Sequence, residues 1–181
     1  YVVATPIGNL EDITFRALRT LKEVDVILCE DTRVTRKLLS YYDIHTPIES
    51  YHEHSSEQAH KKILSRIEKE VTHDHVNDAG TPCIYDPGVF LIAEIRKHFP
   101  ELPIISIPGP SAVITALTIS GLPPNSFLFL GYLSKKQGKR KSSLASLHAI
   151  LDSIDTNFKP TFIFYEAHQR LNEMLNDVKE I

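Results

Sequence analysis

The sequence predicts an α/β protein whose first and larger part is built on a mostly parallel sheet and whose second part is a smaller α+β domain. Up to Ser120, short apolar and β-branched runs alternate with helical patterns, as in chains that join parallel strands through helices. After Gly121, two aromatic strand patterns flank a single helical pattern instead. This change places a boundary between domains 1–121 and 122–181.

The first elements follow from the spacing of their apolar residues. Residues 1–4 and 24–29 are dominated by Val, Ile, Leu and Ala, as expected of buried strands. Between them, apolar residues recur every three positions over 15–21, which predicts a helix capped by Asp12 or Thr14.

The remaining elements of the first domain continue the alternation. The expected strand at 71–76 is unusually polar, because it contains His73-Asp74-His75. An edge position in the sheet, or residues missing from the sequence, would account for that polarity. In chain order we expect a helix at 35–42, a strand at 47–54, a helix at 57–70, the strand at 71–76, a helix at 89–99, a strand at 104–107 and a helix at 111–120.

The second domain begins after the turn Gly121-Leu122-Pro123-Pro124-Asn125. The chain starts within a strand pattern, without Met, and stops within a helical pattern. We interpret it as part of a longer protein with an incomplete second domain. The expected elements of that domain are strands at 127–132 and 161–165, a basic loop between them, and helices at 142–154 and 171–181.

Composition and charge exclude several classes of protein. With 42% hydrophobic and 24% charged residues, the chain is neither collagen-like nor disordered overall. The formal net charge of −3 gives no overall attraction to a polyanion, so nucleic-acid binding would need local basic patches. No apolar run reaches the ~18 residues of a membrane span, and the two cysteines make no metal-binding spacing. We therefore expect a cytoplasmic protein without a membrane partner.

Loops of small and turn-forming residues at 77–88 and 106–112 each run into a helical pattern. Gly permits unusual backbone angles and Pro fixes φ, so such loops bring backbone N–H and C=O groups close to a ligand. Either loop alone could be an ordinary tight connection. With a third loop at 5–10, all at the carboxyl ends of expected strands, they indicate a ligand cleft.

Polar side chains end two of the expected strands. Glu30 and Asp31 follow one strand, and His52 and His54 end the next. These four residues are our candidates for a general base, with Asp31 and His54 preferred and Glu166 as a further choice. Each acid could instead cap a helix or pair with a nearby Arg or Lys.

Histidines spaced two apart, as in His52/His54 and His73/His75, point to one face of a strand. Either pair could form half of a metal site. Such sites normally need three or four ligands, and the sequence places no third ligand beside either pair. We therefore expect no metal.

A basic segment follows the first strand of the second domain. Its five cations are expected on a flexible loop that contacts phosphates of a nucleic acid, or they belong to a solvated linker. Arg33 and Arg36 in the first domain are further candidates for RNA contacts. The five cations are Lys135, Lys136, Lys139, Arg140 and Lys141.

Six motifs occur in an order that resembles the methyltransferase I family of bacterial small-subunit ribosomal RNA methyltransferases, within the tetrapyrrole methylase superfamily. The resemblance covers essentially the whole chain, and six motifs in register are more specific than any one of them. The chain departs from the family pattern at His73-Asp74-His75, at Asn77 and at Tyr85. The motifs are Val3–Thr14, Glu30–Arg33, Ser50–His54, Asp78–Pro82 with Asp86–Gly88, Pro108–Ala112 and Phe164–Glu166.

The resemblance implies a two-domain fold and an enzyme that uses S-adenosylmethionine to methylate the ribose 2′-hydroxyl of a cytidine in the decoding region of small-subunit ribosomal RNA. It also implies a homodimer and a cofactor cleft between the two domains. The implied cofactor-binding residues are Ile7, Asp78, Ala79, Gly80, Thr81, Pro82, Pro108, Gly109, Ser111, Ala112 and Tyr165.

Three other functions fit parts of the pattern. One is a tetrapyrrole C-methyltransferase of the same superfamily, against which the basic segment and the Tyr51–His54 motif argue. Another is a non-catalytic module that keeps the cofactor cleft. The third is a phosphate-binding α/β enzyme, but its Gly-rich loops would lack Lys and Arg and the chain has no Walker pattern.

Overall fold

A computed structural model of the chain describes residues 1–52, 57–69, 72–76, 78–86, 88–154 and 159–181. Its contacts divide the chain into two compact units, Tyr1–Ala112 and Val113–Ile181. The boundary that we expect from the sequence lies slightly later, between 121 and 122. None of the helices in these ranges has the length and apolar character of a membrane span.

The first unit holds a five-stranded parallel sheet in the order β3-β2-β4-β1-β5. The mostly parallel sheet predicted from the sequence is therefore confirmed. A helix lies between each strand of this sheet and the next one along the chain, because parallel strands need a long crossover connection. The strands are β1 (Val2–Val3), β2 (Val26–Cys29), β3 (Ile48–Ser50), β4 (His73–Val76) and β5 (Ser106–Ile107).

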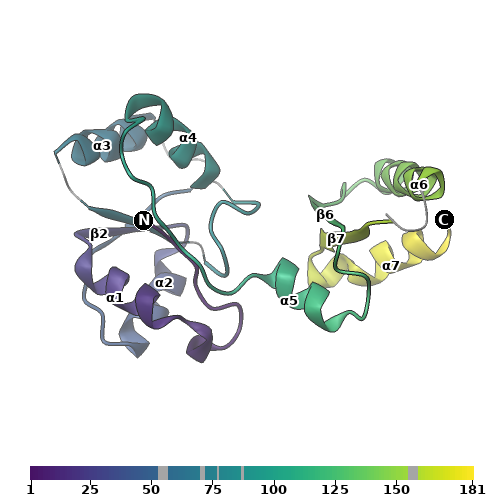
Figure 1. Ribbon diagram of the computed structural model, residues 1–181, viewed down its shortest axis with the longest axis horizontal. Coiled ribbons are helices and arrows are strands. Elements are labelled where there is room, and N and C mark those ends of the chain that lie inside the picture. The colour runs from purple at the N-terminus through teal and green to yellow at the C-terminus, as the bar shows by residue number, and fades with distance from the viewer. Residues whose placement is uncertain (53–56, 70–71, 77, 87, 155–158) are drawn as a thin grey trace. The chain divides into compact units, whose positions relative to one another are not determined.

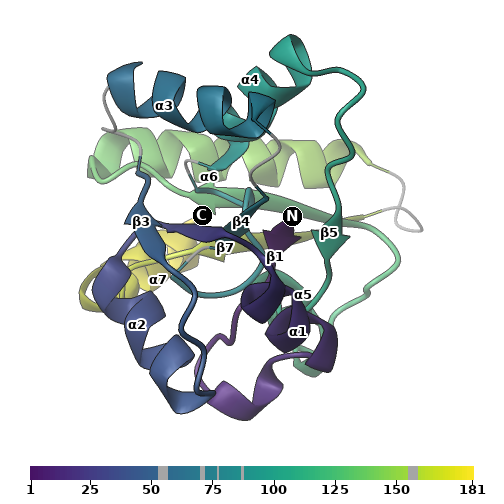
Figure 2. The same cartoon turned by 90° about the vertical axis from the view of Figure 1, so that its left-hand side faces the viewer.

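Helices cover both faces of this sheet. Helices α1 and α2 lie on one face, and α3 and α4 lie on the other (Figure 2). Leu21 and Leu39 belong to the hydrophobic cluster under the first pair, whereas Leu91 and Ile95 belong to the cluster under the second. Their bounds are α1 (Phe15–Glu23), α2 (Thr32–Tyr41), α3 (Glu57–Glu68) and α4 (Gly88–His98), with a short 3-10 helix η1 (Leu10–Asp12) before α1.

The two candidates for the cap of α1 have different roles. Thr14 is the residue that caps the helix, because its Oγ1 accepts a hydrogen bond from the Ala17 N–H at 3.0 Å. Asp12 instead ends the preceding 3-10 helix. A short hydroxyl side chain at this position satisfies a backbone donor that the first turn of any helix leaves unpaired.

Strand β4 lies in the middle of the sheet, between β2 and β1. The expectation that its polarity reflects an edge position was wrong. His75 is only 4% exposed and packs the edge of its ring against Tyr51, with centroids 6.1 Å apart. Val76 belongs to the hydrophobic cluster of the opposite layer. The central strand therefore buries an imidazole where an aliphatic side chain is usual.

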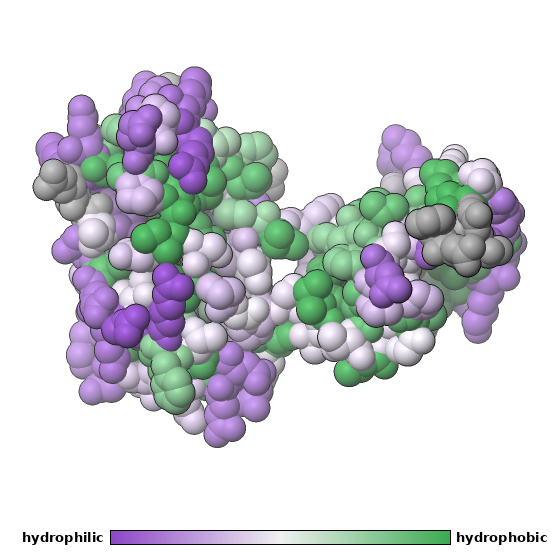
Figure 3. Space-filling model, viewed as in Figure 1, coloured by the Kyte–Doolittle hydropathy of each residue, from purple (hydrophilic) through white to green (hydrophobic). Residues whose placement is uncertain are grey.

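The second unit contains a parallel pair of strands, β6 and β7, joined in sequence by α6 (Figure 1). The register shifts between Phe129 and Tyr132, where Gly131 has a φ of 62°. Hydrophobic residues, Phe127 and Leu128 among them, remain at the surface of this unit (Figure 3). The elements are α5 (Ala112–Ile119), which begins at the end of the first unit, β6 (Phe127–Tyr132), α6 (Gln137–Ser153), β7 (Thr161–Tyr165), the 3-10 helix η3 (His168–Arg170) and α7 (Leu171–Lys179).

Candidate cofactor-binding site

Three loops of the first unit meet beyond the carboxyl ends of β1, β4 and β5. Thr5 and Gly80 form an isolated antiparallel bridge, in which each N–H donates to the other residue's carbonyl at 2.9 and 3.0 Å. Thr81 Oγ1 donates to the Pro110 carbonyl at 3.0 Å and so ties in the loop after β5. The three Gly/Pro loops singled out in the sequence therefore lie side by side, where parallel sheets commonly bind ligands.

Two glycines make this close approach possible. Gly80 has a φ of 85°, and a Cβ there would lie 3.2 Å from Ile7 Cγ2. A Cβ on Gly109 would lie 2.9 Å from the Cβ of Ala4, which real side chains do not tolerate. Both positions therefore disfavour any larger residue, the first through its backbone angle as well as its contacts.

The expected cofactor-binding residues of these loops differ in exposure. Gly80 and Pro82 are buried and form the base of the loops, whereas Ala79, Pro108 and Gly109 are exposed. A ligand can therefore reach the backbone of the exposed residues directly. The half-buried members of the set are Ile7, Asp78, Thr81, Ser111 and Ala112.

Acidic residues gather beside the loops. The Asp31 N–H donates to Asp78 Oδ1 at 2.9 Å, which joins the end of β2 to the loop after β4. Burial raises the pKa of Glu30, and the nearby carboxylates of Asp78 and Asp86 raise it further. Glu30 therefore holds its proton more strongly than a free glutamate, a property that suits a general base near neutral pH.

Asp31 has a structural role at the start of α2. Its Oδ1 accepts from the Arg33 N–H at 2.8 Å, and its carboxylate also pairs with the Arg33 guanidinium. These hydrogen bonds lower the pKa of Asp31 to about 2. A carboxylate that accepts protons so weakly is a poor base, so the geometry favours the cap that we weighed as the alternative, and Glu30 becomes the better candidate.

Of the two candidate histidine bases, only His52 lies within the described residues. His52 is exposed and lies near enough to Glu30 to influence its pKa. His54 lies outside the described residues, so its role as a base stays a prediction.

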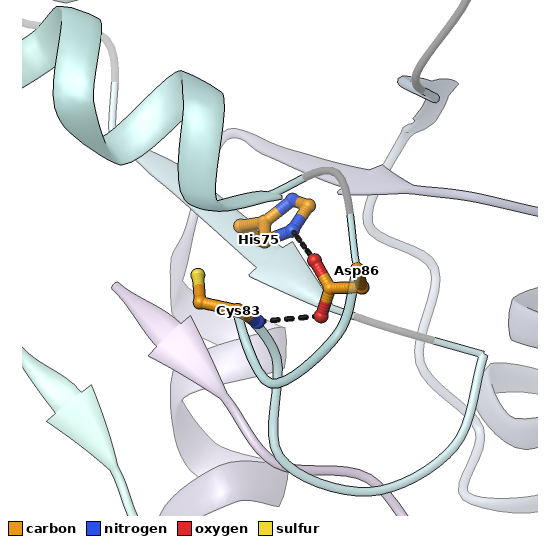
Figure 4. Close-up of side chains that lie close together, drawn as sticks. All are labelled: His75, Cys83 and Asp86. Carbon is orange, nitrogen blue, oxygen red and sulfur yellow. Dashed lines mark hydrogen bonds and ion pairs between the residues drawn. The ribbon is translucent and has the colours of Figure 1, made fainter. Parts of the chain in front are cut away.

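Sequence reasoning missed a cluster beneath these loops, formed by His75, Cys83 and Asp86 (Figure 4). The Asp86 carboxylate accepts from the backbone N–H groups of Cys83 (2.5 Å) and Gly88 (2.6 Å). His75 Nε2 lies 3.8 Å from Asp86 Oδ1, which is too far for a hydrogen bond. The polarity of β4 was the sequence signal that could have pointed to this cluster.

His75 is the unusual member of the cluster. Neither of its ring nitrogens has a hydrogen-bond partner within the described ranges, although both are buried. Such a group costs about 1–3 kcal/mol of folding free energy. A Cβ on Gly88 would lie 2.1 Å from His75 Nε2, so only glycine fits at the start of α4.

The loop that carries Cys83 is held under strain. Cys83 and Tyr85 have φ values of 66° and 64°, in the left-handed region that favours glycine. Burial raises the pKa of the Cys83 thiol to about 11, with a further contribution from Asp86. Burial opposes the charge on Asp86, but His75 and the N–H groups of Gly88 and Cys83 outweigh it, so the Asp86 pKa is lowered. The cluster thus contains a neutral thiol beside a carboxylate.

Tyr165 and Glu166 belong to the second unit. Tyr165 packs against Phe129 at a centroid distance of 4.7 Å, and its assignment to the cofactor stays a prediction. Glu166 pairs with Arg170 and accepts from the Ala167 N–H at 2.7 Å. Its side chain is only 4% exposed, and its role as a further candidate base stays a prediction.

Two of the expected RNA-binding residues lie on α2. Arg33 and Arg36 line a shallow depression of about 590 Å³ together with Lys37. Arg33 remains 85% exposed at its side chain despite its pairing with Asp31. This basic surface is available to a phosphate group.

The basic segment of the second unit differs from the expected loop. Helix α6 begins at Gln137 instead of 142, so Lys139, Arg140 and Lys141 are helical. Arg140 is completely buried, and Lys141 pairs with Glu180. The flexible loop expected at these positions was therefore wrong, and the buried Arg140 side chain cannot reach RNA. An RNA contact of Lys141 stays a prediction, as it does for Lys135, Lys136 and Lys139, which are exposed.

Arg140 joins α6 to α7. Its Nε donates to Asp177 Oδ2 at 2.6 Å, and a terminal nitrogen donates to Glu173 Oε1 at 2.6 Å. The side chains of Arg140 and Asp177 are each 1% exposed. Gln137 and then Arg140 donate to Asp177 and lower its pKa, so the aspartate is charged inside the unit.

We expect Arg140→Ala to destabilise the second unit, because it leaves the buried Asp177 without its cation. Loss of one partner of a buried pair should lower the melting midpoint by roughly 10 °C or more in differential scanning calorimetry. Lys139→Ala, on the exposed side of the same turn, is the control and should leave the midpoint within about 2 °C. Equal midpoints for the two variants would contradict the proposed role of Arg140.

Comparison with known proteins decides the family. All 181 residues match the family described as Tetrapyrrole (Corrin/Porphyrin) Methylases. The chain belongs to the tetrapyrrole methylase family.

Two relatives of this tetrapyrrole methylase chain carry the same name. It is 46% identical over 178 residues to ribosomal RNA small subunit methyltransferase I of Halalkalibacterium halodurans, covering 98% of this chain and 58% of that protein. It is 41% identical to the protein of that name from Thermotoga maritima, covering 99% of this chain and 76% of the relative. The chain spans 58% to 61% of the length of the first five relatives it matches.

One solved structure supports the fold of this methylase chain. A protein from Corynebacterium diphtheriae, described as related to cobalamin synthesis (CobF), aligns with a TM-score of 0.52 over 73% of this chain and 61% of its own. The identity is 19%, so the likeness concerns the fold alone. The expected tetrapyrrole methylase fold is thereby confirmed.

Proposed function

We propose that this chain is the larger part of an S-adenosylmethionine-dependent enzyme that methylates the ribose 2′-hydroxyl of a cytidine in the decoding region of small-subunit ribosomal RNA. The observation that carries the proposal is the meeting of the three Gly/Pro loops, in a chain whose relatives are named ribosomal RNA small subunit methyltransferase I. The chain spans 58% of one of these relatives and 76% of the other, so further residues of the whole protein can contribute to the reaction.

The residues at the three Gly/Pro loops suit S-adenosylmethionine as the cofactor. Close-packed glycines bring the loops together, and Ala79, Pro108 and Gly109 are exposed, so their backbone groups are open to a ligand. The neighbouring acids include Glu30 and Asp78, and they create a negative potential that favours a sulfonium cation and opposes a phosphate. The bound cofactor would supply an activated methyl group.

The protein's part in methyl transfer is to position the ribose hydroxyl and to receive its proton. Glu30 lies beside the loops with a raised pKa, so its carboxylate can take a proton from a weakly acidic hydroxyl better than Asp31 can. Asp31 orders the start of α2, where Arg33 and Arg36 present charge to phosphates. The substrate RNA is thus held by cations on α2 and on the basic segment.

Calorimetry with S-adenosylmethionine and S-adenosylhomocysteine tests cofactor binding, followed by methyl transfer to unmodified small ribosomal subunits. We expect saturable binding of both molecules and label in the ribose of one cytidine. Cofactor binding without methyl transfer to the subunits would indicate a non-catalytic cofactor-binding module. Methylation of a tetrapyrrole carbon would show that the substrate is a tetrapyrrole instead of RNA. The tetrapyrrole alternative is not favoured by the names of the relatives. Gel filtration tests the proposed homodimer.

We expect a charge-reversal variant with Glu at Lys135, Lys136 and Lys139 to bind small subunits more weakly and with less dependence on salt. Each lost phosphate contact should reduce the slope of log affinity against log salt by about 1, because fewer counterions are released. Cofactor affinity should stay the same. Arg140 is left intact because its change would disturb folding.

A matched control reverses Lys22, Lys61 and Lys69, three exposed lysines of the first unit, and changes the net charge equally. The control should keep the parent slope. Equal salt slopes for the parent and the test variant would show that the basic segment does not contact RNA. Equal losses of affinity in the test variant and the control would show that only the overall charge of the chain matters.

A further inference from the structure

We propose that His75, Cys83 and Asp86 bind a Zn²⁺ ion beneath the loop that follows β4. The three residues offer one imidazole nitrogen, one cysteine sulfur and one carboxylate oxygen, and these ligand atoms all lie within 4.8 Å of one another (Figure 4). The sequence placed no third ligand beside His73 and His75. The fold supplies two, because the loop returns Cys83 and Asp86 to the central strand.

The spacing is close to that of a metal site. Around a tetrahedral zinc ion, with Zn–S near 2.3 Å and Zn–N near 2.0 Å, ligand atoms lie roughly 3.3–3.6 Å apart. The separation of 3.8 Å between His75 Nε2 and Asp86 Oδ1 is already near that range. The Cys83 sulfur would have to move by about 1 Å to reach the separation that a tetrahedral zinc site requires. The fourth position would be taken by water.

The donor set selects zinc among common ions. Mg²⁺ and Ca²⁺ prefer oxygen ligands, whereas a thiolate with an imidazole and a carboxylate suits Zn²⁺. On binding, the Cys83 thiol gives its proton to solvent and the sulfur forms the bond to the metal. Cys83 is half-buried, so an ion can enter from its side of the cluster.

A hydrogen-bonded core cluster does not explain the same residues. Asp86 is held by two backbone N–H groups, but both nitrogens of the buried His75 lack hydrogen-bond partners within the described ranges. Gly88 leaves no Cβ between the ring and the carboxylate. A metal ion would take one of these nitrogens as a ligand and would join the strained loop to β4. The site lies next to the proposed cofactor loop but does not depend on that function.

The test is titration of the 181-residue chain with Zn²⁺ under reducing conditions, comparing the parent with His75→Ala and Cys83→Ser. We expect stoichiometric binding by the parent and at least tenfold weaker binding by each variant. His45→Ala removes an exposed histidine and should stay within twofold of the parent. Absence of stoichiometric binding by the parent, or equal affinities in all four proteins, would overturn the proposal.

Cobalt spectroscopy keeps the proposal testable if a variant fails to fold. The chain has two cysteines, and Co²⁺ bound by a thiolate gives a sulfur-to-metal charge-transfer band. We expect the band in the parent and in Cys29→Ala, because Cys29 lies in the other hydrophobic layer. Loss of the band in Cys29→Ala, or its absence from the parent, would show that Cys83 is no ligand.

Discussion

Glu30→Gln should lower the rate of methyl transfer about tenfold to a thousandfold in single-turnover assays with saturating cofactor and RNA. The amide has nearly the same shape as the carboxylate but cannot accept the ribose proton. Glu30 stands beside Asp78 and Asp86, and its raised pKa makes it a stronger base than Asp31. Cofactor affinity should change little, because Glu30 is proposed to act on the ribose hydroxyl of the RNA and not on the cofactor.

The same role for Glu30 predicts how the rate of methyl transfer depends on pH. The rate of the parent should rise with pH through the pKa of Glu30, above its ordinary value of 4.5, and this limb should vanish in Glu30→Gln. Because the folded pKa is raised, charged Glu30 costs stability as pH rises through the same window. The variant should therefore be at least as stable as the parent at neutral pH, as measured by the melting midpoint.

Glu23→Gln, at the exposed end of α1, is the control and should change neither rate nor pH profile. Asp31→Asn and His54→Ala complete the series of candidate bases. If the rate of methyl transfer by Glu30→Gln stays within twofold of the parent and that of His54→Ala falls strongly, then His54 and not Glu30 is the base.

Gly80→Val should weaken the binding of S-adenosylmethionine at least tenfold, or roughly 1.4 kcal/mol, in calorimetry. Two effects add. Valine is a β-branched residue and is strained at a φ of 85°, and its side chain would press on Ile7, 3.2 Å from the ideal Cβ position. The loop would have to move away from Thr5 and Pro110, which align it with the neighbouring loops.

Gly138→Val is the matched control, because a Cβ at Gly138 meets no atom within 4 Å and the residue lies in the second unit. Circular dichroism should first show that both variants are folded. Unchanged affinity in a folded Gly80→Val protein would remove the loop from the cofactor site.

The sequence was sufficient for features that depend on local pattern. Apolar strands such as Val26–Cys29, and the Gly/Pro loops that follow other strands of the sheet, were recognised because neighbouring residues determine both. The cap formed by Thr14 was likewise one of two local choices. Local chemistry thus predicts where elements lie and which loops could meet a ligand.

Features set by distant residues were missed. Arg140 looked like part of a solvated basic run because its partners, Glu173 and Asp177, come more than thirty residues later. His75 looked like an edge residue because its partners depend on a loop that folds back on the strand. In both cases a charge or an imidazole is buried by contacts that periodicity and propensity do not report.

The place of β1 in the sheet has a consequence for biosynthesis. Val2 pairs with His75 on one side and with Ser106 on the other, so β1 gains its second neighbour only when β5, the last strand of this sheet along the chain, has been made. At 5–20 residues per second, a ribosome needs roughly 5–20 s to reach Ile107 after Val3. During that interval β1 can pair only with β4, once His73–Val76 has been made, and the complete sheet must wait for β5 to leave the exit tunnel.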